Sequence, residues 1–246
     1  MAIPVLVLGS RHDVKLPDMH FKKIYSANAA AELVQNYKKK YSNIYHTSVF
    51  GEQEFLKNNL VREKIIKSNP NRLIIRNGNI NSKNYNFKNL EKIVKIGFLK
   101  DLNIQVSNLE LSFFSFIFSE LKYAEDKKIY YFLRCLKKGF FQGFSSGLFA
   151  TLIAANENPL SEVIVSGIGL NDGGGHFYTS TVHKGFFSKN KNLLNNQNEY
   201  RNTNRKRVEA HLFKNLKDKI KSKISSPNIE FCESGNIKYL NCSTIV

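Results

Sequence analysis

The stretch IPVLVLG, residues 3–9, is a continuous apolar run that ends in glycine. Such a run, without polar alternation, is typical of a strand that is buried on both faces of a parallel sheet. A second run of this kind is EVIVSGIG, residues 162–169. The other predicted strands are 22–28, 43–51 and 72–78, and the predicted helices are 29–41, 52–68 and 145–157. This alternation predicts an α/β fold: a single Rossmann-like domain over residues 1–246, with a mostly parallel sheet and helices on both faces.

Four segments stand outside this alternation. Residues from about 79 to 141 begin with a polar, loop-like stretch and continue as an aromatic, helical pattern, so we expect a helical insertion there. Residues 179–202 are polar and without a clear period, which favours a lid loop. A strongly basic helix is predicted over 204–224, followed by a last strand and turn over 228–235.

The composition favours anionic partners. The chain has 37 Lys and Arg against 20 Asp and Glu, a formal net charge of +17. This charge suits nucleic acid, an acidic membrane face or phosphorylated small molecules, although a genome-wide drift toward Lys and Asn would also produce it. Three scattered cysteines are too few for a disulfide framework or a zinc motif. With no transmembrane segment or signal peptide in view, we expect a cytoplasmic protein, and peripheral contact with the inner membrane stays open.

The start of the predicted helix at 145 is the best candidate for a phosphate site. The P-loop pattern is missing, and the glycines of 167–173 lack the spacing of a dinucleotide fingerprint. By contrast, Ser145, Ser146 and Gly147 open a helix, where backbone amides and hydroxyls can hold an anion. One of these serines can also be the helix N-cap. The two roles are compatible.

Metal chemistry is not favoured by the sequence. No two of the six histidines have metal-ligand spacing on one helix, and no Asp-x-Asp pair occurs. We therefore expect a metal-independent mechanism without a cofactor. His176, within GLNDGGGHFY at 169–178, follows a buried strand, and open α/β sheets bind ligands at that end of their strands.

Two alternative functions arise from other motifs. GSRHD, residues 9–13, is similar to the Arg-His pair of histidine-type phosphohydrolases, but Asp13 stands where those enzymes have glycine and would repel a phosphate. The basic helix would suit a nucleic-acid- or anionic-lipid-binding protein without catalysis. No known nucleic-acid module is visible, however, and a solvated basic face explains the helix equally well.

Four blocks of sequence, taken in order, resemble a known family. They are VLVLGSRHDVKLP, IYSANAAAE, FSSGLFATLIAANENPLSEVIVSGIGL and GGGHFY. In order and spacing they are similar to the bacterial lipooligosaccharide sialyltransferases of glycosyltransferase family 42, and they cover roughly half of the chain. The resemblance implies a single-domain glycosyltransferase with a parallel sheet and a lid. Such an enzyme moves sialic acid, or a similar 2-keto sugar acid, from a CMP-sugar donor to a surface or lipid-linked glycan without a metal ion, as in lipopolysaccharide biosynthesis.

The resemblance also implies roles for particular residues. Those that fall on the nucleotide-binding positions are Gly9, Ser10, Asn28, Ser145, Ser146 and Gly147. Tyr178, or Phe177 if the loop is counted strictly, falls near a tyrosine that steadies the leaving phosphate.

The chain departs from the family pattern at two positions. Asn171 stands where the family has its other phosphate tyrosine, and the family's catalytic histidine aligns best with Arg201 or Arg207. His183 and His211 lie on either side of that position. We expect Arg207 to hold the phosphate together with Tyr178, and His176 or His183 to be the base that activates the acceptor hydroxyl.

Overall fold

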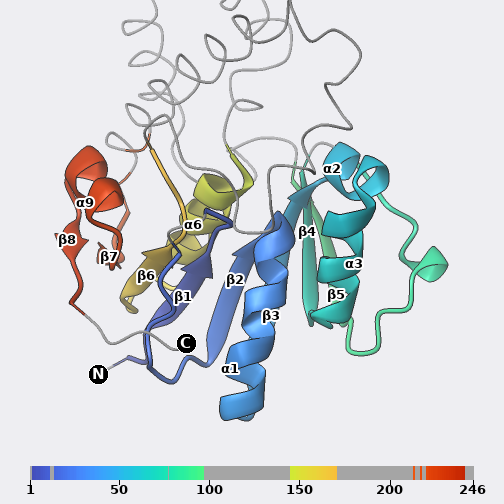
Figure 1. The fold of residues 1–246 in the computed structure, drawn as a ribbon, viewed down its shortest axis with the longest axis horizontal. Coiled ribbons are helices and arrows are strands. Elements are labelled where there is room, and N and C mark those ends of the chain that lie inside the picture. Colours follow the sequence, from blue (N-terminus) through green and yellow to red (C-terminus); the bar gives the residue numbers. More distant parts are fainter. Residues whose placement is uncertain are drawn as a thin grey trace, which may run out of the picture.

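The fold is an eight-stranded, all-parallel sheet with helices on both faces, as predicted (Figure 1). The computed structural model describes residues 2–11, 14–76, 78–96, 145–170, 213, 217 and 220–241. The strands are β1 (Val5–Leu8), β2 (Lys23–Ala27), β3 (Tyr45–Gly51), β4 (Arg72–Arg76), β5 (Lys92–Ile96), β6 (Val163–Ser166), β7 (Ile224–Ser226) and β8 (Lys238–Tyr239). Their order across the sheet is β5-β4-β3-β2-β1-β6-β7-β8. The chain thus winds from β1 toward β5 in one direction and from β6 toward β8 in the other.

Two layers of helix cover the sheet. On one face lie η1 (Asn28–Leu33), α1 (Val34–Lys40) and α3 (Asn59–Lys67), which pack on the inward residues of β1 to β4. The other face carries α6 (Ser146–Glu157), which packs on Val7, Tyr25 and Val49 of three neighbouring strands. The short helices α2 (Glu52–Lys57), η2 (Ser82–Asn84) and α9 (Ile229–Gly235) complete the described elements. Figure 1 shows α6 behind the sheet and α1 and α3 in front of it.

Helix α6 is apolar around its circumference, because it lies inside the protein rather than on its surface. Every residue from Leu148 to Ala155 is buried, which is the pattern of a central core helix. It begins at Ser145, whose side chain accepts a hydrogen bond from the Leu148 amide over 3.3 Å. It ends at Asn158, whose Nδ2 donates to the Ala154 carbonyl over 2.7 Å.

The strands β1 and β6 meet where the winding of the sheet reverses. The Gly9 amide donates to the Ser166 carbonyl over 2.7 Å, and the Arg11 amide donates to the Gly167 carbonyl over 3.0 Å. A Cβ on Gly9 would lie 2.1 Å from the Gly167 oxygen, so only glycine fits. Gly167 itself has φ +69°, a conformation that glycine adopts without strain. The two strand ends are therefore joined tightly at the point where open α/β sheets bind ligands.

Several elements differ from the sequence prediction. Part of the segment expected as a helical insertion at about 79–141 is the strand β5, which pairs with β4 at the edge of the sheet; residues 97–144 lie outside the described residues. The residues of 228–235, expected as a strand, form α9, because Phe231 and Cys232 turn one side of a short helix into the core. Strand β7 begins at Ile224, inside the predicted basic helix.

Two predicted helices are also interrupted. Residues 28–33 are a 3-10 helix rather than the start of α1. Asn58 leaves the helical conformation between α2 and α3, and its side chain caps α3 by accepting from the Val61 amide over 3.2 Å. This local capping breaks the single helix that the apolar pattern of 52–68 had predicted.

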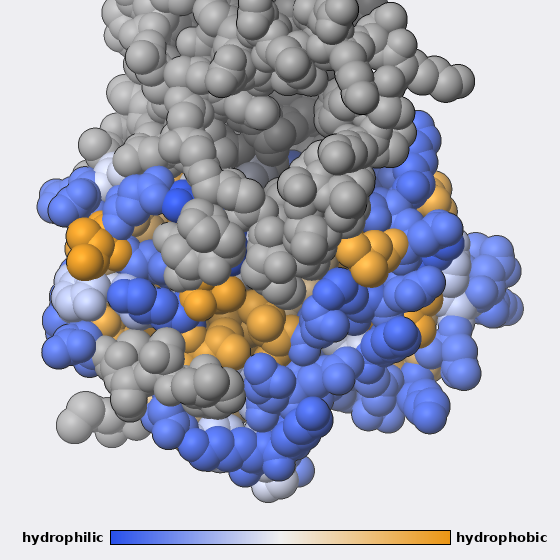
Figure 2. All heavy atoms as spheres, viewed as in Figure 1, coloured by the Kyte–Doolittle hydropathy of each residue, from blue (hydrophilic) through white to orange (hydrophobic). Residues whose placement is uncertain are grey.

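The surface of the described residues is mostly hydrophilic on the face that Figure 2 shows. Large hydrophobic side chains are exposed at separate segments of the chain: Ile3, Leu56, Leu160, Ile229 and Tyr239. Among the helices of the described ranges, none has the length and apolar character that crossing a membrane requires.

Candidate functional site

The predicted nucleotide residues that the structure describes lie along the carboxyl edge of the sheet, which is the side where its parallel strands end. Gly9 and Ser10 follow β1, and Asn28 follows β2, so they leave neighbouring parallel strands at their carboxyl ends. Ser145, Ser146 and Gly147 open α6, whose chain runs back toward the amino ends of the strands. Arg76, at the carboxyl end of β4, donates to Ser146, whereas Arg72, at the amino end of β4, donates to Glu157, and these two contacts establish the direction of α6. Three separate parts of the sequence therefore contribute to one edge.

The side chain of Ile168 joins two of these parts. A Cβ placed on Gly9 would lie 2.5 Å from Ile168 Cγ1, and a Cβ on Gly147 would lie 3.0 Å from the same atom. The loop after β1 and the first turn of α6 therefore pack against one side chain that follows β6. Because both backbones approach so closely, larger residues at Gly9 or Gly147 would push the start of α6 away from the sheet.

Asn28 has an unusual backbone and side chain for a surface loop residue. It adopts φ +51°, in the left-handed region, at the carboxyl end of β2. Its Oδ1 is buried, and no group among the described residues donates a hydrogen bond to it. A buried acceptor without a donor costs about 1–3 kcal/mol. The acceptor without a donor, at the carboxyl end of a parallel strand, makes Asn28 a candidate ligand-binding residue.

Arg76 is a member of this edge that the sequence interpretation missed. It ends β4 and is only 7% exposed. Its Nη1 donates to Ser146 Oγ over 3.1 Å, and its guanidinium lies 4.8 Å from the centre of the Phe149 ring. A buried cation thus stands beside the first turn of α6. The sequence carries one signal for it: RLIIR places a charged residue at the carboxyl end of an otherwise apolar strand.

Glu52 fixes the loop that follows Arg76. Its Oε1 accepts from the Asn79 amide over 2.9 Å, and a Cβ on Gly78 would lie 2.3 Å from its carboxylate. Since Glu52 begins α2 directly after β3, it ties the ends of β3 and β4 together. This contact limits the directions in which the loop beyond Arg76 can leave the sheet.

Arg11 does not support the phosphohydrolase alternative. Its guanidinium donates through both terminal nitrogens to the two carboxylate oxygens of Glu230 on α9, with 3.0 Å between Nη1 and Oε1. It also passes over Gly169, where a Cβ would lie 1.9 Å from Nη1. Arg11 thereby joins the loops after β1 and β6 to α9 in a bidentate ion pair, a structural role. His12 and Asp13 lie outside the described residues.

The predicted catalytic residues are not among those that the structure describes. His176, Tyr178, His183 and Arg207 all lie outside the described ranges, as do Phe177, Asn171, Arg201 and His211 and the predicted lid at 179–202. Leu170, the last described residue before this part, is buried against the core that contains α6. Within the described ranges, no group of three or more His, Cys, Asp or Glu is placed to hold a metal ion.

The buried histidine His46 belongs to the core and not to this edge. It lies in β3 and its Nε2 is 2.8 Å from Ser26 Oγ. Burial, with a smaller contribution from the Lys38 charge, lowers its pKa to about 3. The imidazole is therefore neutral at physiological pH and cannot serve as a proton donor there.

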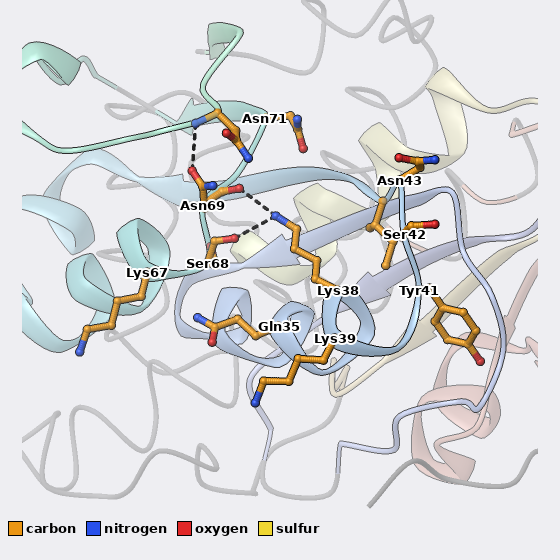
Figure 3. A pocket seen from close by; sticks show the side chains of 12 residues that line it. Gln35, Lys38, Lys39, Tyr41, Ser42, Asn43, Lys67, Ser68, Asn69 and Asn71 are labelled. Atoms are coloured by element: carbon orange, nitrogen blue, oxygen red, sulfur yellow. Dashed lines mark hydrogen bonds between the residues drawn. The ribbon is translucent and has the colours of Figure 1, made fainter.

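A pocket of about 480 Å³ lies at the amino ends of the strands, on the side of the sheet opposite the carboxyl edge (Figure 3). The Lys38 ammonium is aimed at the carbonyls of Ser68 and Asn69, to which it donates over 3.0 and 2.8 Å, whereas Lys39 and Lys67 extend away from it. Lys38 thus satisfies carbonyls at the carboxyl end of α3, and its burial lowers its pKa. Lys38 therefore has a structural role in this pocket.

Comparison of the chain with protein-family models, with curated proteins and with solved structures found no match.

Proposed function

We propose that the protein is a metal-independent glycosyltransferase that takes a sialic-acid-like 2-keto sugar acid from a CMP-sugar donor and transfers it to a glycan acceptor. The observation that carries this proposal is the convergence around Ile168. The resemblance assigns the residues around Gly9 and Gly147 to one nucleotide, although 138 positions separate them in the sequence. In the fold they pack on one side chain at the carboxyl edge of a parallel sheet.

The chemistry of this edge suits a nucleotide monophosphate. The first N–H groups of an α-helix have no acceptor within the helix, and they carry the positive end of its dipole. Ser145 accepts the hydrogen of Leu148, so the amides of Ser146 and Gly147 are those that would meet a phosphate oxygen. Asn28 Oδ1 would accept a hydrogen bond from the ribose or the base. A CMP leaving group carries less charge than a diphosphate. We therefore expect these neutral donors, together with Arg207, to stabilise the departing phosphate without a metal ion.

The reaction assigns the remaining roles to residues outside the described ranges. In the proposed mechanism His176 or His183 removes the proton from the acceptor hydroxyl, while Tyr178 and Arg207 steady the departing phosphate. The glycosidic bond forms as the bond between the sugar and the CMP oxygen breaks. The acceptor is a surface or lipid-linked glycan. Such a protein works in the cytoplasm, in peripheral contact with the inner membrane where the acceptor lies.

The proposal is tested by nucleotide binding in solution. We expect CMP to raise the melting temperature of the protein and to bind more tightly than UMP, GMP or AMP in calorimetry, with or without magnesium. At a ligand concentration 100 times Kd, the stabilisation should be about 2.7 kcal/mol. Release of CMP from a CMP-sugar in the presence of a glycan acceptor then tests the transfer step. Equal or absent stabilisation by all four nucleotides would count against the proposal.

A further inference from the structure

Arg76 and Ser146 form the contact that joins the end of β4 to the start of α6. Arg76 is 7% exposed and Ser146 is 9% exposed, so both lie inside the protein. Arg76 Nη1 is the donor and Ser146 Oγ is the acceptor, over 3.1 Å. A serine hydroxyl has one proton to donate and two lone pairs that accept. Because the guanidinium can only donate, the bond occupies a lone pair of Ser146 and leaves the hydroxyl proton for another acceptor.

Two of the contacts of the Arg76 guanidinium are with residues of α6. The first contact is the hydrogen bond from its Nη1 to Ser146 Oγ. The second is with the Phe149 ring, one turn further along α6, whose centre lies 4.8 Å from the guanidinium carbon. Cation and ring attract each other in such an arrangement. Both partners belong to the first turns of the same helix, so Arg76 links the end of β4 to the start of α6.

The position of this cation is opposite to what helix stability favours. A positive side chain stabilises a helix at its carboxyl end and opposes the dipole at its amino end. The same strand provides the contrast: Arg72, on the same face of β4, lies at the carboxyl end of α6 and binds Glu157 there. At the amino end, the arginine, the helix dipole and the amides of Ser146 and Gly147 all favour an anion.

We propose that Arg76 is a positioning residue: it holds the Ser146 hydroxyl so that this hydroxyl donates to the phosphate of a nucleotide bound at the start of α6. The inference rests on the proposed function and specifies its ligand as a phosphate ester, not as a free nucleoside. Arg76 and Ser146 act as a pair, and the pair contributes to phosphate recognition without contributing to recognition of the base.

The experiment compares CMP with cytidine in the full-length protein. Calorimetry gives the affinity ratio of the two ligands for the unmodified protein, Arg76→Gln, Arg76→Lys, Ser146→Ala and the Arg76→Gln/Ser146→Ala double variant. We expect Arg76→Gln and Ser146→Ala each to weaken CMP binding by about 10- to 100-fold, and to leave the affinity for cytidine nearly unchanged. The double variant should lose little more than the more severe single variant. Arg76→Lys keeps the charge and should recover part of the loss.

Arg72→Lys is the matched control, since it makes the same substitution on the same strand and face at the other end of α6. It should lower the melting temperature and leave the ratio of CMP to cytidine affinity unchanged. A ratio that stays the same in Arg76→Gln and Ser146→Ala would overturn the inference while leaving the proposed function intact. Failure of the unmodified protein to bind CMP would instead overturn the proposed function. If Arg76→Gln does not fold, Arg76→Lys and Ser146→Ala decide the question by the same ratio.

Discussion

The two ends of α6 are held by two arginines of β4, and they are held in different ways. At the carboxyl end, Arg72 donates to both oxygens of Glu157 over 2.8 and 2.7 Å, and Tyr25 donates to the same carboxylate over 2.7 Å. At the amino end, Arg76 meets a hydroxyl and an aromatic ring. Charges of opposite sign are matched at the first end. At the second end a cation lies beside the positive end of the helix dipole, an arrangement that the proposed binding of an anion there would use.

The pKa of Arg72 agrees with this difference. Burial alone would lower the pKa of Arg72, but the hydrogen bonds and the charge of Glu157 outweigh burial and raise it. Glu157 thus stabilises the charged form of Arg72: its two carboxylate oxygens accept three hydrogen bonds, two from Arg72 and one from Tyr25.

The largest expected effect comes from breaking the carboxyl end of α6. Glu157→Ala removes the acceptor of both Arg72 and Tyr25 and leaves a half-buried arginine without its carboxylate. The side chain of Glu157 is 30% exposed, so we expect a loss of about 2–3 kcal/mol rather than the 3–5 kcal/mol of a fully buried pair. Urea denaturation measures this loss. Glu63→Gln, an exposed acid on α3, is the control and should change stability by less than about 0.5 kcal/mol. A loss of that small size in Glu157→Ala would mean that the two ends do not differ.

Acid should lower the stability of the folded protein through His46, which lies in β3 on the face of the sheet opposite α6. The pKa of His46 is about 3 in the folded protein, below its ordinary value of 6.5. Between these values the unfolded chain binds a proton that the folded protein does not, so stability is complete above about pH 6.5 and falls as the pH falls toward 3. The loss approaches about 1.4 kcal/mol per pH unit, or about 2 kcal/mol at pH 5.

Stability measured against pH in His46→Gln tests this expectation and sharpens the comparison. The slope contributed by His46 should disappear, and His20→Gln should keep it. Since His46 lies away from both ends of α6, neither variant should alter the affinity ratio of CMP to cytidine. Retention of the full slope in His46→Gln would assign the acid sensitivity to other groups.

A smaller effect is expected at the tight amino end. Gly147→Ala gains up to about 1 kcal/mol of helix propensity, but the new Cβ would lie 3.0 to 3.3 Å from three atoms of Ile168. We expect crowding to prevail, with a net loss of about 1 kcal/mol. In an Ile168→Val background the crowding is relieved, and the same substitution should be neutral or stabilising. Thermal denaturation of the four proteins gives the coupling, and additive losses would mean that Ile168 can move aside.

The smallest change in stability is expected at Asn28, where a loss of ligand binding can be measured without a loss of folding. Asn28→Gly removes a side chain from a left-handed residue and removes a buried acceptor that no described group satisfies. Stability should stay the same or rise by up to about 1 kcal/mol, while CMP affinity falls. Melting temperature and calorimetry on the same sample measure the two effects. A loss of stability without a loss of CMP affinity would make Asn28 a structural residue.

The accuracy of the sequence interpretation followed the burial of each element. The central strands were predicted because both of their faces are buried, so their residues form uninterrupted apolar runs such as VLVL. The edge strand β5 was missed, because KIVKI has lysines at exposed positions and follows a polar loop. Helix α9 was taken for a strand, since seven residues are too few to distinguish the two periods.

The candidate site was predictable only where a local signal exists. Ser145 could be predicted as a cap because small polar residues before an apolar run have a local role at a helix start. The strand RLIIR marks Arg76 as a charged residue at a strand end, but its contact with Ser146 could not be predicted, since the two residues are 70 positions apart in the sequence. Only the parallel order of the strands brings these two residues together.

The outer strands of the sheet have a consequence for association between molecules. Strand β8 has two residues, both exposed, and β5 carries the exposed lysines Lys92 and Lys95. Strand β8 offers only two residues for backbone hydrogen bonds with a strand from another chain. Along β5, such a strand would have to approach two positive charges. Within the part of the chain that the structure describes, both outer strands therefore discourage the addition of a strand from another molecule.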